Sequence, residues 1–276
     1  MGVSGSETMM VDLHCHVLPG IDDGAESLEQ SLEFCRAALE DGVSVLVATP
    51  HQKPGHFDTT PEAIREKAED LRRALREAAI PVEIVEGAEV YLSADLVASL
   101  REGKVCTLGN TGRYLLLELP YQQMPLRVEE TVFQLKVAGV TPVLAHPERI
   151  AYFTADPDRL EKLVRLGCLS QITADALLGG FGEKTRDLSR RLLERGLVHV
   201  ISSDAHDAIH RPPVLSRARD AAAEVVGTER ARQMVSDVPL SLCRGVDWEP
   251  WDLPPEPVPA PAGLMDRLRS LFGGRG

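Results

Sequence analysis

The feature that most constrains the fold is a regular alternation of short apolar runs with amphipathic helical patterns. A helix between successive buried strands makes the strands parallel, with right-handed crossovers. We therefore expect an α/β fold whose seven strands form either a barrel or an open doubly wound sheet. No GxGxxG or GxxxxGK[ST] loop is present, and a barrel needs none. The expected strands cover 10–14, 43–49, 82–86, 114–119, 141–145, 168–173 and 197–203.

Helical patterns separate these runs, and two of them carry boundary signals. Gly42 is a typical C-terminal stop for the first helix, and Thr59 or Thr60 is a suitable cap for the second, with Pro61 in its first turn. The other helices are expected over 127–138, 157–166, 184–195 and 214–226. In the first helix, over 27–41, spacings of three and four predict one apolar face made of Leu28, Leu32, Cys35 and Leu39.

Composition limits the function classes. The net charge of −12 argues against general nucleic-acid binding, which needs a basic surface. Five cysteines, an odd number without a CxxC pair, fit a reducing compartment better than a disulfide framework. No apolar run reaches the roughly 20 residues of a membrane-spanning helix, and the first ten residues do not resemble a signal peptide. We expect a cytoplasmic protein.

The chain divides into four segments. Residues 1–9 are expected to form a disordered N-terminal extension, residues 10–246 one catalytic domain, and residues 247–262 a proline-rich, semi-rigid linker. Residues 263–276 then place Leu264, Leu268 and Phe272 on one face of a short basic amphipathic helix. Such a helix could contact a membrane surface or a partner, although a frayed tail is the favoured alternative at this length.

Histidines and acidic residues gather where the expected strands end. The carboxyl ends of parallel strands form the active face of such folds, so these side chains should converge. Imidazoles and carboxylates brought together in this way bind divalent metals. The candidate metal ligands are His14, His16, Asp23, His51, Glu89, Glu118, His146, Asp204 and His206.

Individual positions differ in how strongly they point to metal. His14 and His16 are two residues apart on a strand, which puts both imidazoles on one face and leaves Cys15 in the core. Glu118 lies in a run of leucines, where a carboxylate is costly unless it is paired or metal-bound. The alternative for Glu118 is an outward-facing position on an edge strand. Each of the other positions also has an ordinary structural explanation when taken singly.

Nine ligands suffice for up to three metal ions that share bridging carboxylates. Mixed imidazole and carboxylate ligands favour manganese, iron or zinc over calcium or magnesium. Arg149 and Arg211 stand a few residues after His146 and His206, and a guanidinium matches phosphate oxygens bidentately. A surface or helix-capping role is the alternative for each arginine.

Together these motifs resemble the PHP (polymerase and histidinol phosphatase) superfamily. Within it, the chain is similar to the bacterial manganese-dependent tyrosine-protein phosphatases of capsular and exopolysaccharide gene clusters. The likeness spans about residues 10–245. It is carried by segments 12–16, 22–24, 49–51, 87–91, 145–149, 197–206 and 211–213, together with Glu118.

The resemblance implies a distorted (β/α)7 barrel with a trinuclear manganese site. It also implies phosphate binding by Arg149 and Arg211, and Asp23 rather than Asp22 as a ligand. The expected substrate is then the phosphorylated tyrosine-rich tail of a membrane-associated kinase that regulates polysaccharide export. The implied ligand sets are His14, His16, Glu89 and Asp204 for the first metal; Glu89, Glu118 and His146 for the second; and Asp23, His51 and His206 for the third.

The expected reaction is hydrolysis of a phosphomonoester by a hydroxide that metal makes available near neutral pH. A phenolate leaves readily, so we assign no general acid. A cysteine-based phosphatase is excluded, because no arginine stands six positions after any cysteine. The alternatives are a small-molecule phosphatase acting on a substrate such as histidinol phosphate, a metal-dependent amidohydrolase, and a non-catalytic metal-bound regulator. Glu118 disfavours the amidohydrolase, which would place a lysine there.

Overall fold

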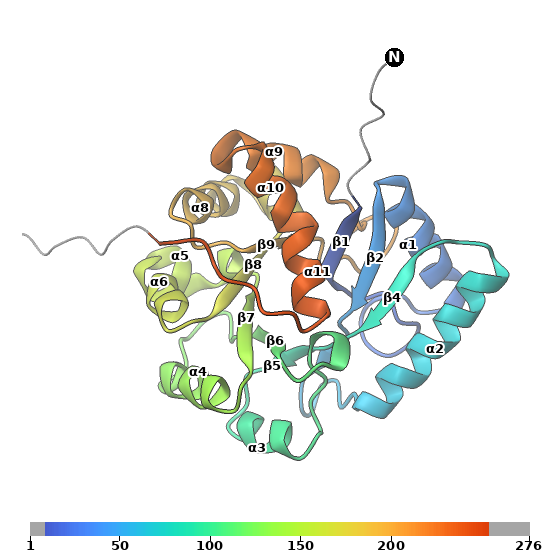
Figure 1. Cartoon of the computed structure of the whole chain (residues 1–276), viewed down its shortest axis with the longest axis horizontal. Coiled ribbons are helices and arrows are strands. Elements are labelled where there is room, and N and C mark those ends of the chain that lie inside the picture. Colours follow the sequence, from blue (N-terminus) through green and yellow to red (C-terminus); the bar gives the residue numbers. More distant parts are fainter. Residues whose placement is uncertain (1–8, 254–276) are drawn as a thin grey trace, which may run out of the picture.

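The computed structural model describes residues 9–253, in which parallel strands are surrounded by helices (Figure 1). The strands are β1 (Met10–Cys15), β2 (Val43–Ala48), β3 (His51–Gln52), β4 (Glu83–Glu86), β5 (Glu89–Tyr91), β6 (Tyr114–Glu118), β7 (Thr141–Ala145), β8 (Leu169–Thr173) and β9 (Val200–Ser202). The helices are α1 (Leu28–Glu40), α2 (Pro61–Glu77), α3 (Leu96–Arg101), α4 (Val128–Val137), α5 (Ala151–Ala155), α6 (Asp158–Arg165), α7 (Ala174–Leu178), α8 (Glu183–Glu194), α9 (Ser216–Val226), α10 (Thr228–Val235) and α11 (Asp237–Cys243).

The strands form two parallel sheets, in the orders β1-β2-β4 and β3-β5-β6-β7-β8-β9. The seven expected strands are all present, and the second and third, β2 and β4, are each followed after a short break by a further short strand, β3 and β5, that was not predicted. Pro50 lies in the first break and Gly87 in the second; a Cβ on Gly87 would lie 3.1 Å from Val47 Cγ1. The sheet is therefore not a continuous closed barrel, and the expectation of a distorted α/β barrel is confirmed.

Backbone contacts join β1 to the segment that follows β9. The amide of Asp204 donates to the carbonyl of His14 at 2.9 Å, and the amide of His16 donates to the carbonyl of Ala205 at 2.9 Å. Strand β3 pairs with β5 in the register of His51 opposite Glu89. These pairings align the ends of strands from both sheets and place their polar side chains together.

One helix packs on a different face from the one predicted. The N-cap of α2 is Thr60 with Pro61 in the first turn, as expected. In α1, however, the buried residues are Ser31, Phe34, Cys35 and Ala38, while Leu28 and Leu39 are 40% and 36% exposed. The Ser31 hydroxyl donates to the carbonyl of Val17 at 2.7 Å, so a small polar residue faces the segment that follows β1 in place of a leucine.

The interior of the strands is closed at one end by helix α11, which lies across them (Figure 1). Val238 and Leu242 of α11 pack in one apolar cluster with Val11, Leu13 and Leu116 from the strands. Trp248 and Trp251, in the described part of the expected linker, also pack against this cluster. The polar side chains occupy the end of the strands away from this apolar cluster. Within residues 9–253, no helix is both long and apolar enough to cross a membrane.

Candidate metal centre

All nine candidate ligands lie at the polar end of the strands. Residues on both sheets contribute, because β1, β3, β5 and β6 each bring one side chain and the segments after β1, β7 and β9 bring the others. Most are buried: His14 and His16 are 0% exposed, and Glu118 and His146 are each 2% exposed. Two placements differ from the sequence expectation, since His51 and Glu89 do not end strands but begin β3 and β5.

Glu89 is the centre of the cluster. Its Oε1 lies 2.8 Å from His146 Nε2, and its Oε2 lies 2.9 Å from His51 Nδ1 and 3.5 Å from His14 Nε2. Burial opposes ionisation, but the imidazoles around the carboxylate, His14 first, hold the pKa of Glu89 well below its ordinary value. A buried anion that several nitrogens approach at once has the arrangement of a carboxylate that bridges cations.

Asp204 lies beside the two histidines of β1. Its Oδ1 is 3.4 Å from His14 Nε2 and 3.5 Å from His16 Nε2. Despite complete burial, the charge of His14 and a hydrogen bond from His16 lower the pKa of Asp204. His14 Nδ1 in turn meets Gln171 Oε1 at 2.9 Å, which fixes the ring so that Nε2 faces the cluster.

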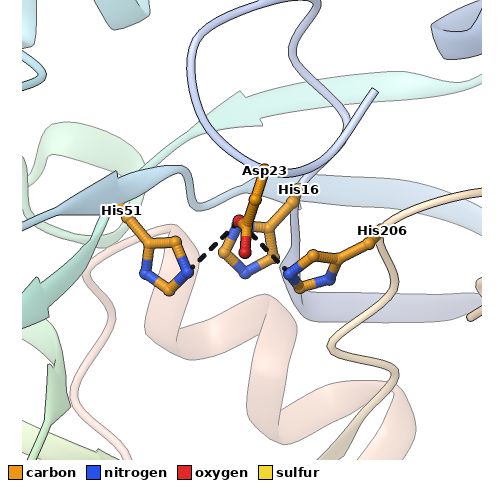
Figure 2. A group of neighbouring side chains, drawn as sticks. All are labelled: His16, Asp23, His51 and His206. Atoms are coloured by element: carbon orange, nitrogen blue, oxygen red, sulfur yellow. Dashed lines mark ion pairs between the residues drawn. The ribbon is translucent and has the colours of Figure 1, made fainter. Parts of the chain in front are cut away.

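A second group of donors surrounds Asp23 (Figure 2). Its Oδ1 lies 3.4 Å from His51 Nε2 and 3.4 Å from His206 Nε2, while the ring of His16 stands between them. Hydrogen bonds from His206 and His51 hold the pKa of Asp23 well below its ordinary value. The Asp23 side chain is 52% exposed, so this group is the most accessible part of the centre.

Asp22 has a different place from Asp23. Its Oδ2 lies 2.7 Å from His16 Nδ1 and accepts the backbone N–H of His51 at 3.1 Å, and its Oδ1 accepts the N–H of Gly24 at 3.0 Å. A Cβ on Gly24 would lie 2.0 Å from the carbonyl oxygen of His16, so only glycine allows this close approach. Asp22 therefore orients His16 from behind, and Asp23 faces the donor atoms.

Glu118 faces inward, not outward. Its Oε2 has no hydrogen-bond partner among the described residues, and its ion-pair partner, Lys53 Nζ, lies 3.7 Å away. Burial and the negative charge of Glu89 raise the pKa of Glu118 to about 7. The edge-strand alternative is thus wrong, because β6 lies between β5 and β7, and the surroundings of the carboxylate suit a cation ligand.

The donor set fits divalent metal. Ligand atoms lie within 4.8 Å of one another in three overlapping groups. The orphaned Glu118 Oε2 and His146 Nδ1 are buried polar atoms of the kind that a metal or its bound water satisfies. The groups are His16, Asp23, His51 and His206; His14, His16 and Glu89; and His51, Glu89 and Glu118.

Both predicted arginines reach this centre. Arg149 Nη1 lies 2.5 Å from Asp204 Oδ2, and Arg211 Nη2 lies 2.8 Å from the same oxygen. Together with Tyr121 and Phe57 they line a cavity of about 190 Å³ that contains the donor groups. Their placement side by side on one carboxylate brings two guanidinium groups to the edge of the metal donors, where an oxyanion could bind both.

Sequence reasoning did not single out several residues around the centre. Tyr121 stacks on His146 with a centroid separation of 5.5 Å, and Phe57 stacks on His51 at 5.2 Å. Lys53 was also missed, although it stands two residues after His51 in the sequence. An aromatic or lysine in a loop carries no distinctive spacing, and only the fold shows what it contacts.

Two further histidines lie outside the donor set, and Cys15 lies in the core as expected. His56 is exposed in a loop, and His199 is buried against Trp251. Cys15 is buried in β1, and burial raises the pKa of its thiol well above the ordinary value. A thiol in that state is a poor nucleophile, which agrees with its assignment to the core.

Comparison with known proteins agrees with this geometry. Residues 10–244 match the family model described as capsular polysaccharide synthesis, CpsB/CapC. The chain belongs to this family. The tyrosine-protein phosphatase YwqE of Bacillus subtilis (strain 168) is 33% identical over 264 residues, which cover 96% of this chain and 99% of YwqE. The tyrosine-protein phosphatase CpsB of Streptococcus pneumoniae is 33% identical over 238 residues, or 84% of this chain and 98% of that CpsB.

A solved structure extends the likeness to three dimensions. A chain from the crystal structures of B. subtilis YwqE and S. pneumoniae CpsB, described as unique metal-dependent tyrosine phosphatases, superposes with a TM-score of 0.85 and 34% identity. The match covers 90% of this CpsB/CapC-family chain and 99% of the other chain. The expected family resemblance is therefore confirmed.

Proposed function

We propose that this CpsB/CapC-family chain is a metal-dependent tyrosine phosphatase that hydrolyses phosphotyrosine in a protein substrate. The observation that carries the proposal is the position of Arg149 and Arg211. Both guanidinium groups lie on Asp204, at the edge of a buried cluster of metal donors. The metal ions that these donors would bind, together with the two guanidinium groups, would place positive charge around the phosphorus and the non-bridging oxygens of a phosphate ester.

The nine residues predicted from the sequence are the proposed metal ligands. His14, His16, Glu89 and Asp204 would hold a first ion, and Glu89 would be shared with Glu118 and His146 for a second. Asp23, His51 and His206 would hold a third, to which His16 is also close enough to contribute. We propose manganese, with iron and zinc as alternatives that the same donor types accept. Bound metal supplies hydroxide near neutral pH by lowering the pKa of water.

The residues of the chain itself have separable tasks. Arg149 and Arg211 bind the phosphate oxygens and neutralise the charge that develops on them. Asp204 holds both guanidinium groups in place before substrate arrives. Gln171 and Asp22 fix the rings of His14 and His16 from behind the donor atoms. No general acid is needed, because a phenolate with a pKa near ~10 is a good leaving group.

The physiological setting is part of the proposal. The relatives are named as tyrosine-protein phosphatases, and the family is that of capsular polysaccharide synthesis. We infer that the substrate is a phosphorylated tyrosine kinase of polysaccharide export. The amphipathic tail predicted over 263–276 lies outside the described residues, as do residues 1–8 and 254–262. Membrane contact through the tail and a cytoplasmic location stay predictions.

The test is metal analysis coupled to hydrolysis. The purified protein is stripped with a chelator, reloaded with Mn²⁺, Fe²⁺ or Zn²⁺, and assayed on a phosphotyrosine peptide and on histidinol phosphate. We expect turnover only with metal and a higher kcat/KM on the peptide. Arg149→Ala and Arg211→Ala should each lower kcat by about 10²- to 10³-fold, the usual effect of losing one transition-state contact.

Arg76→Ala is the matched control, because Arg76 is exposed on α2 and has no ion pair among residues 9–253. It should leave kcat unchanged. Bound metal without turnover would show a regulator instead of an enzyme. A higher kcat/KM on histidinol phosphate would show a small-molecule phosphatase.

A further inference from the structure

A second cavity adjoins the metal centre. It measures about 120 Å³ and lies between α7 and the segment that connects β9 to α9. Its walls combine an apolar part, which includes Phe181, with the cationic side chains of Arg211 and Arg217 and the ring of His210. None of the nine proposed metal ligands lines it, so it is separate from the donor cluster.

The two cavities meet at Arg211, one of the two proposed phosphate-binding arginines. Arg211 lines both cavities, and its Nη2 donates to the Asp204 carbonyl at 2.9 Å and lies 2.8 Å from Asp204 Oδ2. Arg149 lines the metal cavity and packs its guanidinium over the Phe181 ring at 4.7 Å. A substrate phosphate on these arginines would therefore stand directly beside the second cavity.

Arg217 gives the second cavity a charge that nothing among the described residues neutralises. It is exposed and has no ion pair within residues 9–253. It lies in the first turn of α9, where the helix dipole disfavours a cation, so its placement there does not serve helix stability. In a chain with a net charge of −12, an unpaired arginine beside Arg211 creates a local positive field.

Two further observations bear on what could bind. Thr173 lines the same cavity and is 1% exposed, and its hydroxyl has no hydrogen-bond partner among the described residues. Asp175 is the one carboxylate among the lining residues, and its side chain lies so close to Gly180 that a Cβ there would be 1.8 Å from Oδ2. The buried Glu148 lies behind this wall, where its Oε1 accepts the Thr173 N–H at 2.8 Å. Two arginines against one lining carboxylate favour an oxyanion as the ligand.

We propose that this second cavity binds another anionic group of the same substrate, a carboxylate or a second phosphate near the phosphotyrosine, with Arg217 as its specificity-determining residue. The inference rests on the proposed phosphatase function and adds a sequence preference to it. The enzyme should hydrolyse phosphotyrosines that have an anionic neighbour faster than those that do not.

The experiment compares kcat/KM on matched peptides that differ near one phosphotyrosine. The neighbouring residues are alanine, glutamate, lysine or a second phosphotyrosine, scanned over positions on both sides. The manganese-loaded full chain should favour its best glutamate or doubly phosphorylated peptide over alanine by about fivefold, the effect of one partly solvated ion pair. The glutamate and phosphotyrosine peptides distinguish a carboxylate ligand from a phosphate ligand.

Arg217→Glu reverses the charge without placing strain on the helix, since an acid suits the first turn of α9. It should abolish the preference for the anionic neighbour and raise the kcat/KM of the lysine peptide relative to the others. Arg76→Ala removes an exposed helix arginine that lines neither cavity and should keep the wild-type order of peptides.

Two results would overturn the inference alone: equal kcat/KM on all peptides in the wild type, or the same order of peptides in Arg217→Glu. A uniform loss on every peptide and on free phosphotyrosine would also overturn it, because Arg217 would then act on the reacting phosphate. No hydrolysis of any phosphotyrosine peptide by the metal-loaded wild type would instead refute the proposed function, and this inference with it.

Discussion

Substitution of Glu118 by glutamine should change the stability of the protein in opposite directions with and without metal. The Glu118 carboxylate is 2% exposed, lies in a strand of leucines, and has an oxygen without a hydrogen-bond partner among the described residues. In the metal-free protein this ionised group is costly, because Lys53 at 3.7 Å is too distant for a hydrogen bond. Glutamine keeps the shape of the side chain and removes its charge.

The size of the effect follows from the pKa. Burial and Glu89 raise the pKa of Glu118 from an ordinary value of 4.5 to about 7 in the folded, metal-free protein. The folded state then binds more protons than the unfolded state between these values, so stability is highest below pH 4.5 and falls as the pH rises through 7. At about 1.4 kcal/mol per pKa unit, the raised pKa of Glu118 corresponds to roughly 3 kcal/mol of stability lost at pH 8.

Chelator-treated Glu118→Gln should therefore be more stable than the chelator-treated wild type at pH 8, by up to about 3 kcal/mol or roughly 6–12 °C in Tm. At pH 4.5 the two should be equal. With saturating Mn²⁺ the order should reverse, because metal that binds only the folded state stabilises it and glutamine weakens that binding. Differential scanning fluorimetry with chelator and with Mn²⁺ measures both.

The control is Glu86→Gln, another carboxylate at a strand end. Glu86 Oε1 lies 3.0 Å from Arg72 Nη1, and neither residue lines the metal cavity. Loss of that pair should lower stability slightly, and equally, under both conditions. If chelated Glu118→Gln is less stable than chelated wild type at pH 8, the carboxylate is satisfied without metal and the reasoning is wrong.

Three further substitutions test individual side chains. Asp22→Asn removes the charge behind His16 and should lower Mn²⁺ affinity or kcat/KM by about 10- to 100-fold. Asp23→Asn removes a proposed ligand and should reduce the metal content by one ion. Equal metal contents in the two variants would contradict the separate roles of Asp22 and Asp23. His199→Gln should reduce the loss of stability in acid. Burial lowers the pKa of His199 from an ordinary value of 6.5 to about 3 in the folded protein. The stability that neutral His199 provides is therefore present above pH 6.5 and is lost as the pH falls from there toward 3. Denaturant titrations at pH 7 and pH 4.5 check this, and an unchanged difference between the two pH values would contradict it.

The sequence was sufficient for the order of elements and for most of the site. Strand β7 has the predicted bounds, and six other strands begin or end within three residues of their predicted positions. Periodicity detects such elements because apolar runs must be buried. It did not predict the short strands β3 and β5 beyond Pro50 and Gly87, because two or three residues are too few to show a period. The breaks at Pro50 and Gly87 bring His51 and Glu89 to the start of short strands instead of the ends of long ones.

Roles that depend on distance were beyond the sequence. Asp22 and Asp23 are chemically identical neighbours, and only the course of the loop around Gly24 decides which one faces the donor atoms. The face of α1 was also mispredicted, since leucines at regular spacing can lie in solvent when a serine and an alanine allow closer packing on the sheet. The spacing of apolar residues shows which side chains share a face of a helix, but not how closely that face packs on its neighbours.

The site also depends on backbone conformations that residue preferences disfavour. His146, directly after β7, and Asp204, two residues after β9, both have left-handed backbone, with φ of 35° and 51°. Non-glycine residues in this region cost about 1–3 kcal/mol each. What the conformation achieves is a turn immediately at the strand end, which directs His146 toward Glu89 and Asp204 toward His14. At the other end of the strands, α11 packs on the apolar cluster inside them, and this burial stabilises the fold against the cost of the strained backbone. Residues at the ligand end are thus selected for where they aim their donor atoms, and this explains why chemical pattern located them better than secondary-structure preference.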